Sequence, residues 1–206
     1  MNNKHLLARA GIGVTGAMLL VSGAAVAVAD EVAGEDVEVN VEIEAQEPVG
    51  ALTMSVASDS TALIEVESSD ADVRQFNGTL PTVTVSDDRQ EVPEGVFWYV
   101  TGQSSAFAAE GLPEIGPDQL GWTPNLITDD GVVASGDEVL TSLDEGEDAV
   151  GLVAEELLAL AWDSAEAQDT TGEWEADAAL FLKTPSDVAP GSYSATLTLT
   201  LWEDGV

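Results

Sequence analysis

The feature that most constrains the fold of this chain is a strict alternation of apolar and polar residues in short runs. In the last run, Leu197, Leu199 and Leu201 alternate with threonines, which is the two-residue period of a strand with one buried face. Turn signals such as Pro190-Gly191 separate the runs. The runs lie at 52–56, 63–66, 79–86, 96–102, 119–127, 174–183 and 191–202, with shorter pieces near Val139 and Val150. Many short strands with intervening turns predict an all-β fold, a sandwich of antiparallel strands.

One segment fits two periods. Residues 150–167 are rich in helix formers, and part of their apolar pattern has helical spacing. Within them, Leu158, Leu160 and Trp162 also alternate as in a strand. In a chain that is otherwise strand-forming, we favour a strand over Leu157–Asp163, with a helical turn before it.

Residues 1–29 have the three parts of a secretory signal peptide. Lys4 and Arg9 form a basic start, Ala10–Val21 is almost wholly apolar or small, and Ala27-Val28-Ala29 offers a cleavage site. The apolar run is shorter than the roughly 20 residues that a membrane-spanning helix needs. We therefore expect a secreted, extracellular protein whose mature chain has no transmembrane segment.

The mature chain divides into a lead-in, residues 30–47, and a sandwich domain, residues 48–206. In the lead-in, Val37, Val39, Val41 and Ile43 alternate with residues that are nearly all acidic. This period predicts either an edge strand or a stiff, charged linker. We use the name lead-in for residues 30–47 throughout.

Charge and composition exclude several classes of function. The chain has 39 acidic and 5 basic residues and a net charge of −34, so it lacks the cations with which proteins bind a nucleic-acid backbone. It contains no cysteine, and its one histidine, His5, lies in the signal peptide. Catalytic triads with histidine and zinc sites of imidazole or thiolate are therefore excluded in the mature chain. We expect no enzyme activity and no cofactor.

Acidic clusters leave one alternative open, weak binding of Ca²⁺. The clusters are Asp70 with Asp72, Asp129 with Asp130, and the acids of residues 144–148. None has the spacing of a twelve-residue EF-hand loop. Irregular Ca²⁺ sites of loop carboxylates leave no sequence pattern, and the other interpretation is a solvated acidic surface.

Three stretches together resemble a known family. They are Val83–Arg89 followed by Phe97–Gln103, then Leu120–Pro124, and finally Pro190–Leu201. In this order they are similar to WxL-type cell-surface proteins of Gram-positive bacteria, especially a divergent actinobacterial branch. The resemblance covers about Leu52–Glu203. It implies a non-enzymatic β-sandwich module that associates non-covalently with peptidoglycan.

The resemblance also singles out residues. Trp98 and Val100 match the first W-x-[LV] motif, but Leu199 stands where the second motif has its tryptophan, and Trp202 lies outside that position. This departure puts wall binding through paired tryptophans in doubt. The candidate motif or wall-contact residues are Trp98, Val100, Trp122, Tyr193, Leu199, Leu201 and Trp202.

Each of these residues also has a structural interpretation. Trp98 shares a strand face with Val100, which favours a place in the core over a sugar-binding platform, whereas Trp122 fits core and surface equally. Tyr193 follows Pro-Gly-Ser and predicts a corner tyrosine whose hydroxyl binds the backbone. Arg89 follows two aspartates and predicts a structural ion pair.

The sequence therefore predicts a secreted, non-enzymatic cell-surface module that associates non-covalently with the Gram-positive cell wall. One alternative is an adhesin or assembly subunit that binds a partner surface protein by strand addition. Another is an acidic, cation-binding surface protein. The expected partners are cell-wall polymer or a partner surface protein.

Overall fold

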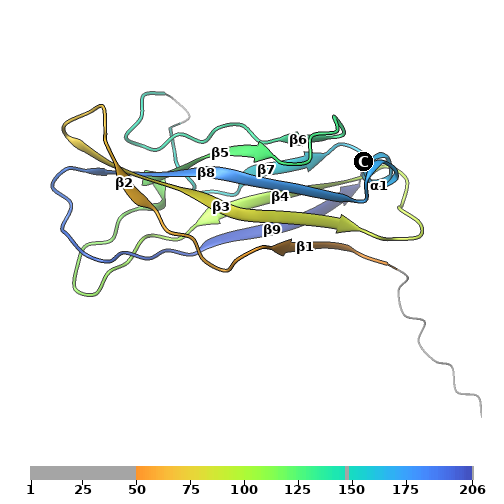
Figure 1. Ribbon diagram of the computed structural model, residues 1–206, viewed down its shortest axis with the longest axis horizontal. Helices are drawn as coiled ribbons and strands as arrows, with labels where there is room; N and C mark the ends of the chain where they lie inside the picture. The colour runs from red at the N-terminus through yellow and green to blue at the C-terminus, as the bar shows by residue number, and fades with distance from the viewer. Residues whose placement is uncertain (1–49, 147–148, 206) are drawn as a thin grey trace, which may run out of the picture. The chain divides into compact units, whose positions relative to one another are not determined.

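In the computed structural model, which describes residues 50–146 and 149–205, nine strands form two antiparallel sheets packed face to face (Figure 1). The predicted all-β sandwich is thereby confirmed. The predicted signal peptide and all of the lead-in lie outside the described residues. No helix within these residues has the length and apolarity to cross a membrane.

The first sheet has the order β1-β3-β8-β5, and β2 also pairs with β3. Its strands are β1 (Leu52–Val56), β2 (Ile64–Val66), β3 (Val73–Asp87), β5 (Leu120–Leu126) and β8 (Glu173–Pro185). The register of β3 against β8 shifts between Leu80 and Val83. Pro81 lies at this shift, because a proline without an N–H is tolerated in a sheet at such an irregularity.

The second sheet has the order β6-β7-β4-β9. Its strands are β4 (Val96–Ser104), β6 (Val133–Ser135), β7 (Glu156–Ala161) and β9 (Leu197–Gly205). The strand β6 was missed by the sequence analysis, which expected short strands near Val139 and Val150 instead. Val139 makes only an isolated bridge to Trp122, and β9 begins later than the predicted run over 191–202.

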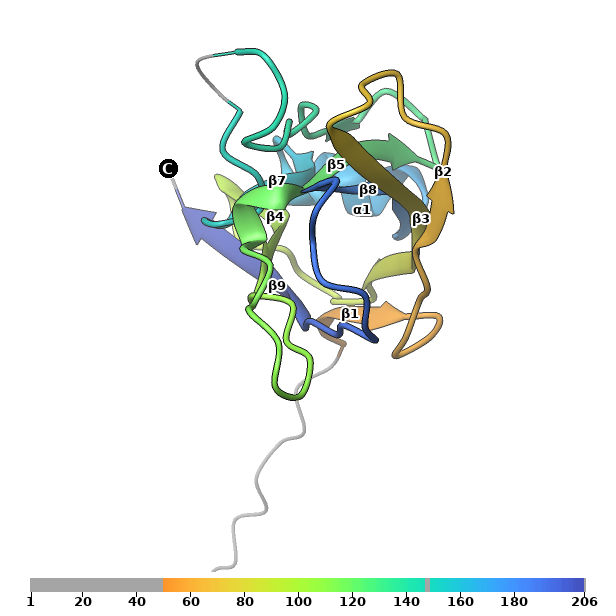
Figure 2. The same ribbon diagram turned by 90° about the vertical axis from the view of Figure 1, so that its left-hand side faces the viewer.

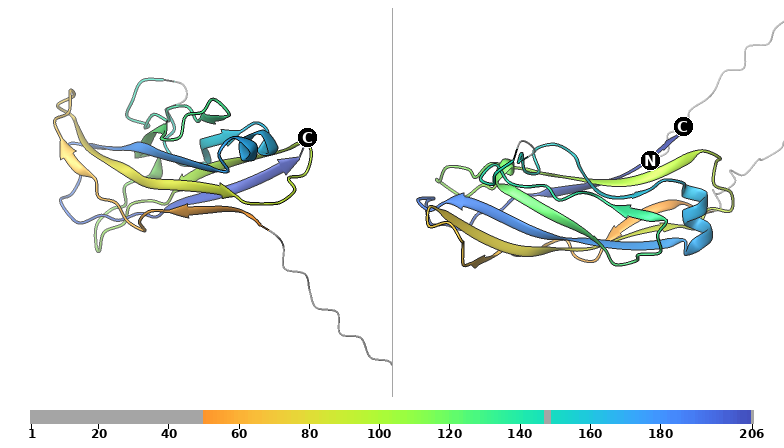
Figure 3. Two further views of the ribbon diagram at one scale, coloured as in Figure 1. Left: turned by 45° about the vertical axis from the view of Figure 1, so that its right-hand side comes forward. Right: turned by 90° about the horizontal axis from the view of Figure 1, so that it is seen from above.

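The ambiguous segment forms a strand, β7, as predicted. The expected helical turn before it was wrong, because the helix follows it as α1 (Ser164–Thr170). Asp163 caps α1, since its side chain accepts hydrogen bonds from the backbone N–H groups of Ala165 and Glu166. The helix lies at one end of the sandwich (Figure 3).

Between the sheets, the core is densest around three tryptophans. Trp98 and Trp122 are fully buried, and Trp174 is buried against Trp98 with their ring centroids 5.7 Å apart. A short glycine contact permits this packing: a Cβ atom at Gly102 would lie 2.6 Å from the ring of Trp122. The inward faces of β3, β5 and β8 in the first sheet and of β4 and β7 in the second therefore supply most of the buried hydrophobic side chains.

Candidate functional site

The two halves of the sandwich are not equally closed. Around Trp98 and Trp174 the remaining cavity is only about 10 Å³. Toward the other end, a groove of about 1160 Å³ runs between the first sheet and β9. We call this the seam groove, and its apolar lining includes Met54, Phe76, Phe107, Tyr193, Leu197 and Leu199. Its volume is at the upper limit of ordinary ligand pockets.

Edge strands form the two long sides of the seam groove. Within residues 50–146 and 149–205, β1 pairs only with β3, and β9 pairs only with β4. Both strands lie on the same side of the sandwich (Figure 2). Each therefore has one edge whose backbone N–H and C=O groups are available to a further strand.

Side chains along the seam groove are only half covered. Leu197, Leu199 and Leu201 point toward the core from β9, yet all three remain partly exposed. On the opposite side, Met54 is partly exposed and Val56 is 39% exposed. These apolar side chains face the core, but in the described part of the chain no further strand covers them, so they stay partly exposed to solvent.

Charge is sparse in the seam groove. Although the chain has 39 acidic residues, Asp59 is the one acid among the groove's lining residues in the described ranges, and Arg74 is the one base. Arg74 is held by Glu65 through two hydrogen bonds of 2.9 and 3.0 Å and lies over the ring of Phe76. The groove is thus a neutral, apolar surface on an otherwise acidic molecule.

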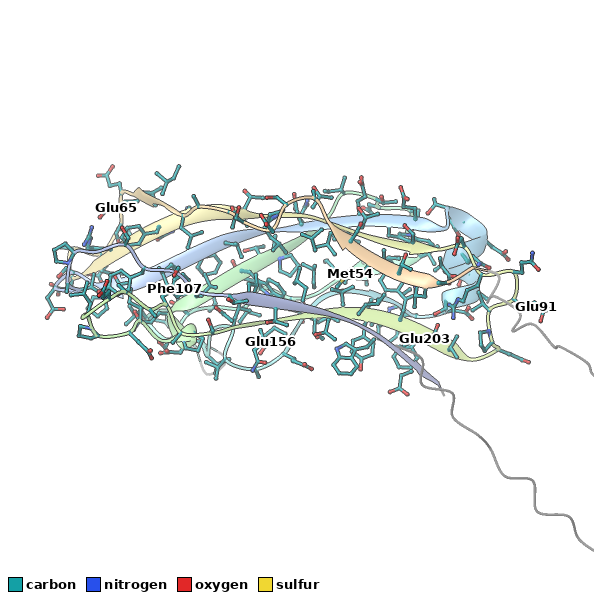
Figure 4. The ribbon with its side chains drawn as sticks, turned by 90° about the horizontal axis from the view of Figure 1, so that it is seen from below. Met54, Glu65, Glu91, Phe107, Glu156 and Glu203 are labelled. Atoms are coloured by element: carbon teal, nitrogen blue, oxygen red, sulfur yellow. The ribbon has the colours of Figure 1, made fainter. Side chains whose placement is uncertain are left out.

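The two ends of the groove differ in what the chain offers there. Glu65 and Phe107 lie toward one end of the sandwich, Met54 lies between the ends, and Glu91 lies at the other end (Figure 4). We call the end with Phe107 the open end and the end with Glu91 the entry end. At the open end, Tyr193 donates its hydroxyl to the carbonyl of Ala189 at 3.0 Å, which confirms the predicted corner tyrosine.

Toward the entry end, a buried ion pair joins the end of β3 to β9. Asp87 is buried and accepts hydrogen bonds from the Arg89 guanidinium at 2.8 and 2.6 Å, and Arg89 also binds Glu203. Burial raises the pKa of Asp87, but the contacts with Arg89 outweigh it and hold that pKa below its usual range. Gln168 of α1 donates to both Asp87 and the carbonyl of Arg89. The predicted structural ion pair of Arg89 is confirmed.

On the outer face of the second sheet, three aromatic side chains form a strip. Phe97 and Tyr99 stack with centroids 5.9 Å apart, and Tyr99 stacks on Trp202 at 6.3 Å. The indole N–H of Trp202 donates to the hydroxyl of Thr101 at 2.9 Å, and Trp202 is 39% exposed. We call Phe97, Tyr99 and Trp202 the aromatic strip.

Acids from two of the acidic clusters are engaged by side chains of β8. Asp144 forms an ion pair with Lys183 and accepts from Thr141, and Asp130 accepts from the indole N–H of Trp174 at 3.1 Å. Within residues 50–146 and 149–205, no three acidic side chains converge in the way that a metal site requires.

The structure separates the candidate residues of the sequence analysis into two groups. Trp98, Val100 and Trp122 are buried in the core and offer no surface to a wall polymer. Tyr193 and Leu199 line the seam groove, and Leu201 lies farther along the same face of β9. Trp202 faces outward in the aromatic strip.

Sequence reasoning missed the seam groove as a site. The signal available to it was weak, because the leucines of β9 alternate in the same way as the buried residues of β8. Only the pairing order tells that one strand is central and the other is at an edge.

No family model, curated protein or solved structure compared with this chain matches it.

Proposed function

We propose that this protein is a secreted, non-enzymatic cell-surface module that holds an extended apolar segment of a partner protein in the seam groove by strand addition. One observation carries the proposal: a partly exposed apolar groove of about 1160 Å³ lies between two strands that each have an available edge. In strand addition, backbone hydrogen bonds supply affinity and alternate side chains fill the groove.

The chemistry of the groove supports a peptide strand as its occupant. A bound strand satisfies the backbone groups along β1 or β9, which a compact apolar ligand does not do. Apart from Asp59 and Arg74, the lining combines a majority of apolar residues with serines and threonines, so a mostly apolar face of the bound strand fits it. Threonines and acids on the other face of such a strand remain in water.

A single methionine side chain, that of Met54, can report whether the seam groove is occupied. Met1 and Met18 belong to the signal peptide, so Met54 is the only methionine of the mature chain. It lines the seam groove. In protein labelled with ¹³C at the methionine methyl group, one resonance therefore reports on the occupancy of the groove.

The test uses the mature chain, residues 30–206, with Val39→Ser and Val41→Ser, so that the chain's own alternating segment does not compete. We titrate it with a nine-residue synthetic peptide of alternating threonine and valine. The methyl resonance of Met54 is expected to shift saturably. A peptide of the same composition with its valines adjacent is the control, because it cannot present a single apolar face. An unchanged resonance with both peptides contradicts strand addition.

A second candidate function, contact with cell-wall glycan, is favoured by the aromatic strip. Stacked aromatic rings on an exposed sheet face offer apolar area for a sugar ring. Because this chain is strongly acidic, it is repelled by anionic wall polymers, and contact with neutral glycan or bridging by divalent cations is needed.

Sedimentation with purified cell-wall sacculi, with and without EDTA, tests this candidate. Trp202→Ala is expected to abolish sedimentation, whereas the matched variant Trp162→Ala is not, because Trp162 is 73% exposed and outside the strip. Sedimentation that EDTA abolishes indicates cation bridging instead of direct glycan contact. If Trp202→Ala sediments like the wild-type protein, the strip is not a glycan platform.

A further inference from the structure

We propose that the segment bound in the seam groove is the lead-in of a second copy of this chain, so that copies associate head to tail. This inference rests on the proposed function and names its partner. It combines the groove and its two edge strands with the alternation of Val37, Val39, Val41 and Ile43, which lie outside the described residues.

The side-chain pattern of the lead-in complements the groove. Its apolar residues recur at every second position, which in a strand places them about 6.6–6.8 Å apart on one face. Leu197 and Leu199, which point into the groove from β9, have the same spacing. An added strand with this face inward therefore meets the half-covered leucines in register.

The charge pattern of the lead-in fits the same orientation. Asp36, Glu38, Glu42 and Glu44 occupy the opposite face of the predicted strand. With the valines in the groove, these acids point into water. In the reverse orientation, the acids would be buried against the apolar lining, which carries a high free-energy cost of desolvation. The pattern therefore determines which face of the lead-in strand points into the groove.

The described end of the chain explains why the partner is another copy and not the same molecule. Gly50 and Ala51 are held at the entry end: the N–H of Ala51 donates to the Asp88 carboxylate at 2.6 Å, and a Cβ at Gly50 would lie 2.1 Å from the Asp88 carbonyl. Phe107, which also lines the groove, lies toward the open end.

A lead-in that folded back on its own domain would have to reverse before Gly50 and then run beside β1. Over seven residues from Val37 to Ile43 it extends roughly 24 Å, and most of that length would lie alongside the five residues of β1. Its apolar residues would then lie beside Met54 and Val56 of β1 and leave Leu197 and Leu199, on the opposite side of the groove, without a paired strand.

Donation to a second copy has a consequence for assembly. Each copy gives its lead-in and receives another in its seam groove, so the giving and receiving surfaces are different. A contact between unlike surfaces is heterologous, and it produces open chains of copies unless its rotation closes a ring. Because every copy is strongly acidic, salt screens the repulsion and is expected to strengthen the association.

The absence of native cysteine allows a clean crosslinking test on the mature chain. The double variant Val41→Cys/Leu199→Cys puts one thiol on the apolar face of the lead-in and one in the groove. Under mild oxidation, donation between copies produces a ladder of disulfide-linked multimers. Folding back within one molecule produces a compact monomer, which would overturn the proposal. The matched control is Val41→Cys/Thr198→Cys, whose thiols lie on opposite faces of the extended sheet.

A second measurement does not depend on cysteines. By sedimentation velocity, the mature chain is expected to form larger species as its concentration and the salt concentration rise. Val39→Ser/Val41→Ser is expected to weaken this association by about tenfold or more, because two buried valines are lost. Equal association of both proteins, or monomers at every concentration together with no crosslink above control, overturns the proposal.

The peptide titration of Met54 distinguishes the two levels of failure. If the alternating peptide shifts the Met54 resonance but copies neither crosslink nor associate, strand addition stands and the partner is a different protein. If the peptide also has no effect, the proposed function fails together with the inference.

Discussion

The strands β8 and β9 have similar alternating sequences but different surroundings. In β8, the inward side chains from Trp174 to Thr184 are all buried, because β3 and β5 flank the strand and the second sheet covers it. In β9, Leu197, Leu199 and Leu201 stay partly exposed, because β4 is the only described neighbour. The comparison separates a central strand that is fully covered from an edge strand whose leucines stay partly exposed in the seam groove.

The largest expected effect on stability is in the sealed core around Trp98 and Trp174. Trp98→Ala removes a fully buried indole that packs on Trp174, and we expect it to lower the free energy of unfolding by about 3–5 kcal/mol. Urea unfolding followed by circular dichroism measures the change. A smaller loss than that of Leu199→Thr, described below, would show that the core around Trp98 does not contribute more to stability than the seam groove does.

The next effect concerns the ion pair at the entry end. Asp87→Asn leaves Arg89 without its main buried partner, and we expect a loss of about 2–4 kcal/mol at neutral pH. Because the pKa of Asp87 is lowered in the folded state, this stabilisation is present above the unfolded pKa of about 3.9 and is lost as pH falls through the folded pKa.

The pH dependence is best measured as a difference. Thermal unfolding of wild type and Asp87→Asn between pH 3 and 7 is expected to give curves that converge as the pH falls below about 4. The difference cancels the shared effect of protonating the many other carboxylates. A gap that stays constant down to pH 3 would show that the carboxylate charge contributes nothing.

The smallest effect on stability is expected in the seam groove. Leu199→Thr changes a half-exposed groove residue to one that also favours strands, and we expect a loss of about 1 kcal/mol or less. The same variant should weaken peptide binding at Met54. A loss of stability in the dilute protein as large as that of Trp98→Ala would show that Leu199 is fully packed in the isolated protein. The contrast between the sealed core and the seam groove would then be wrong.

Much of the fold was predictable from the sequence. The alternation located β1, β4, β5 and β8 to within a few residues, and it placed Trp98 and Val100 on one face of their strand. The corner contact of Tyr193 followed from its place after a turn. These predictions worked because they depend on neighbours in the chain, where period and turn chemistry act directly.

Other features were not predictable in the same way. Val133–Ser135 forms β6 although it has too few residues to show a period, and its pairing with β7 is what makes it a strand. Trp122 fitted core and surface equally because its burial depends on Gly102 and Val139, which are distant in sequence. The aromatic strip requires β4 and β9 to be neighbours.

The sequence by itself determined the fold class, the acidity and the absence of cysteine chemistry, since each follows from composition or from local period. Only the tertiary structure decided which alternating strands are covered. Leu180 of β8 and Leu199 of β9 look alike in sequence, yet Leu180 is buried and Leu199 stays partly exposed. The reason is that burial of a strand depends on the order of pairing across the sheet, which local sequence does not encode.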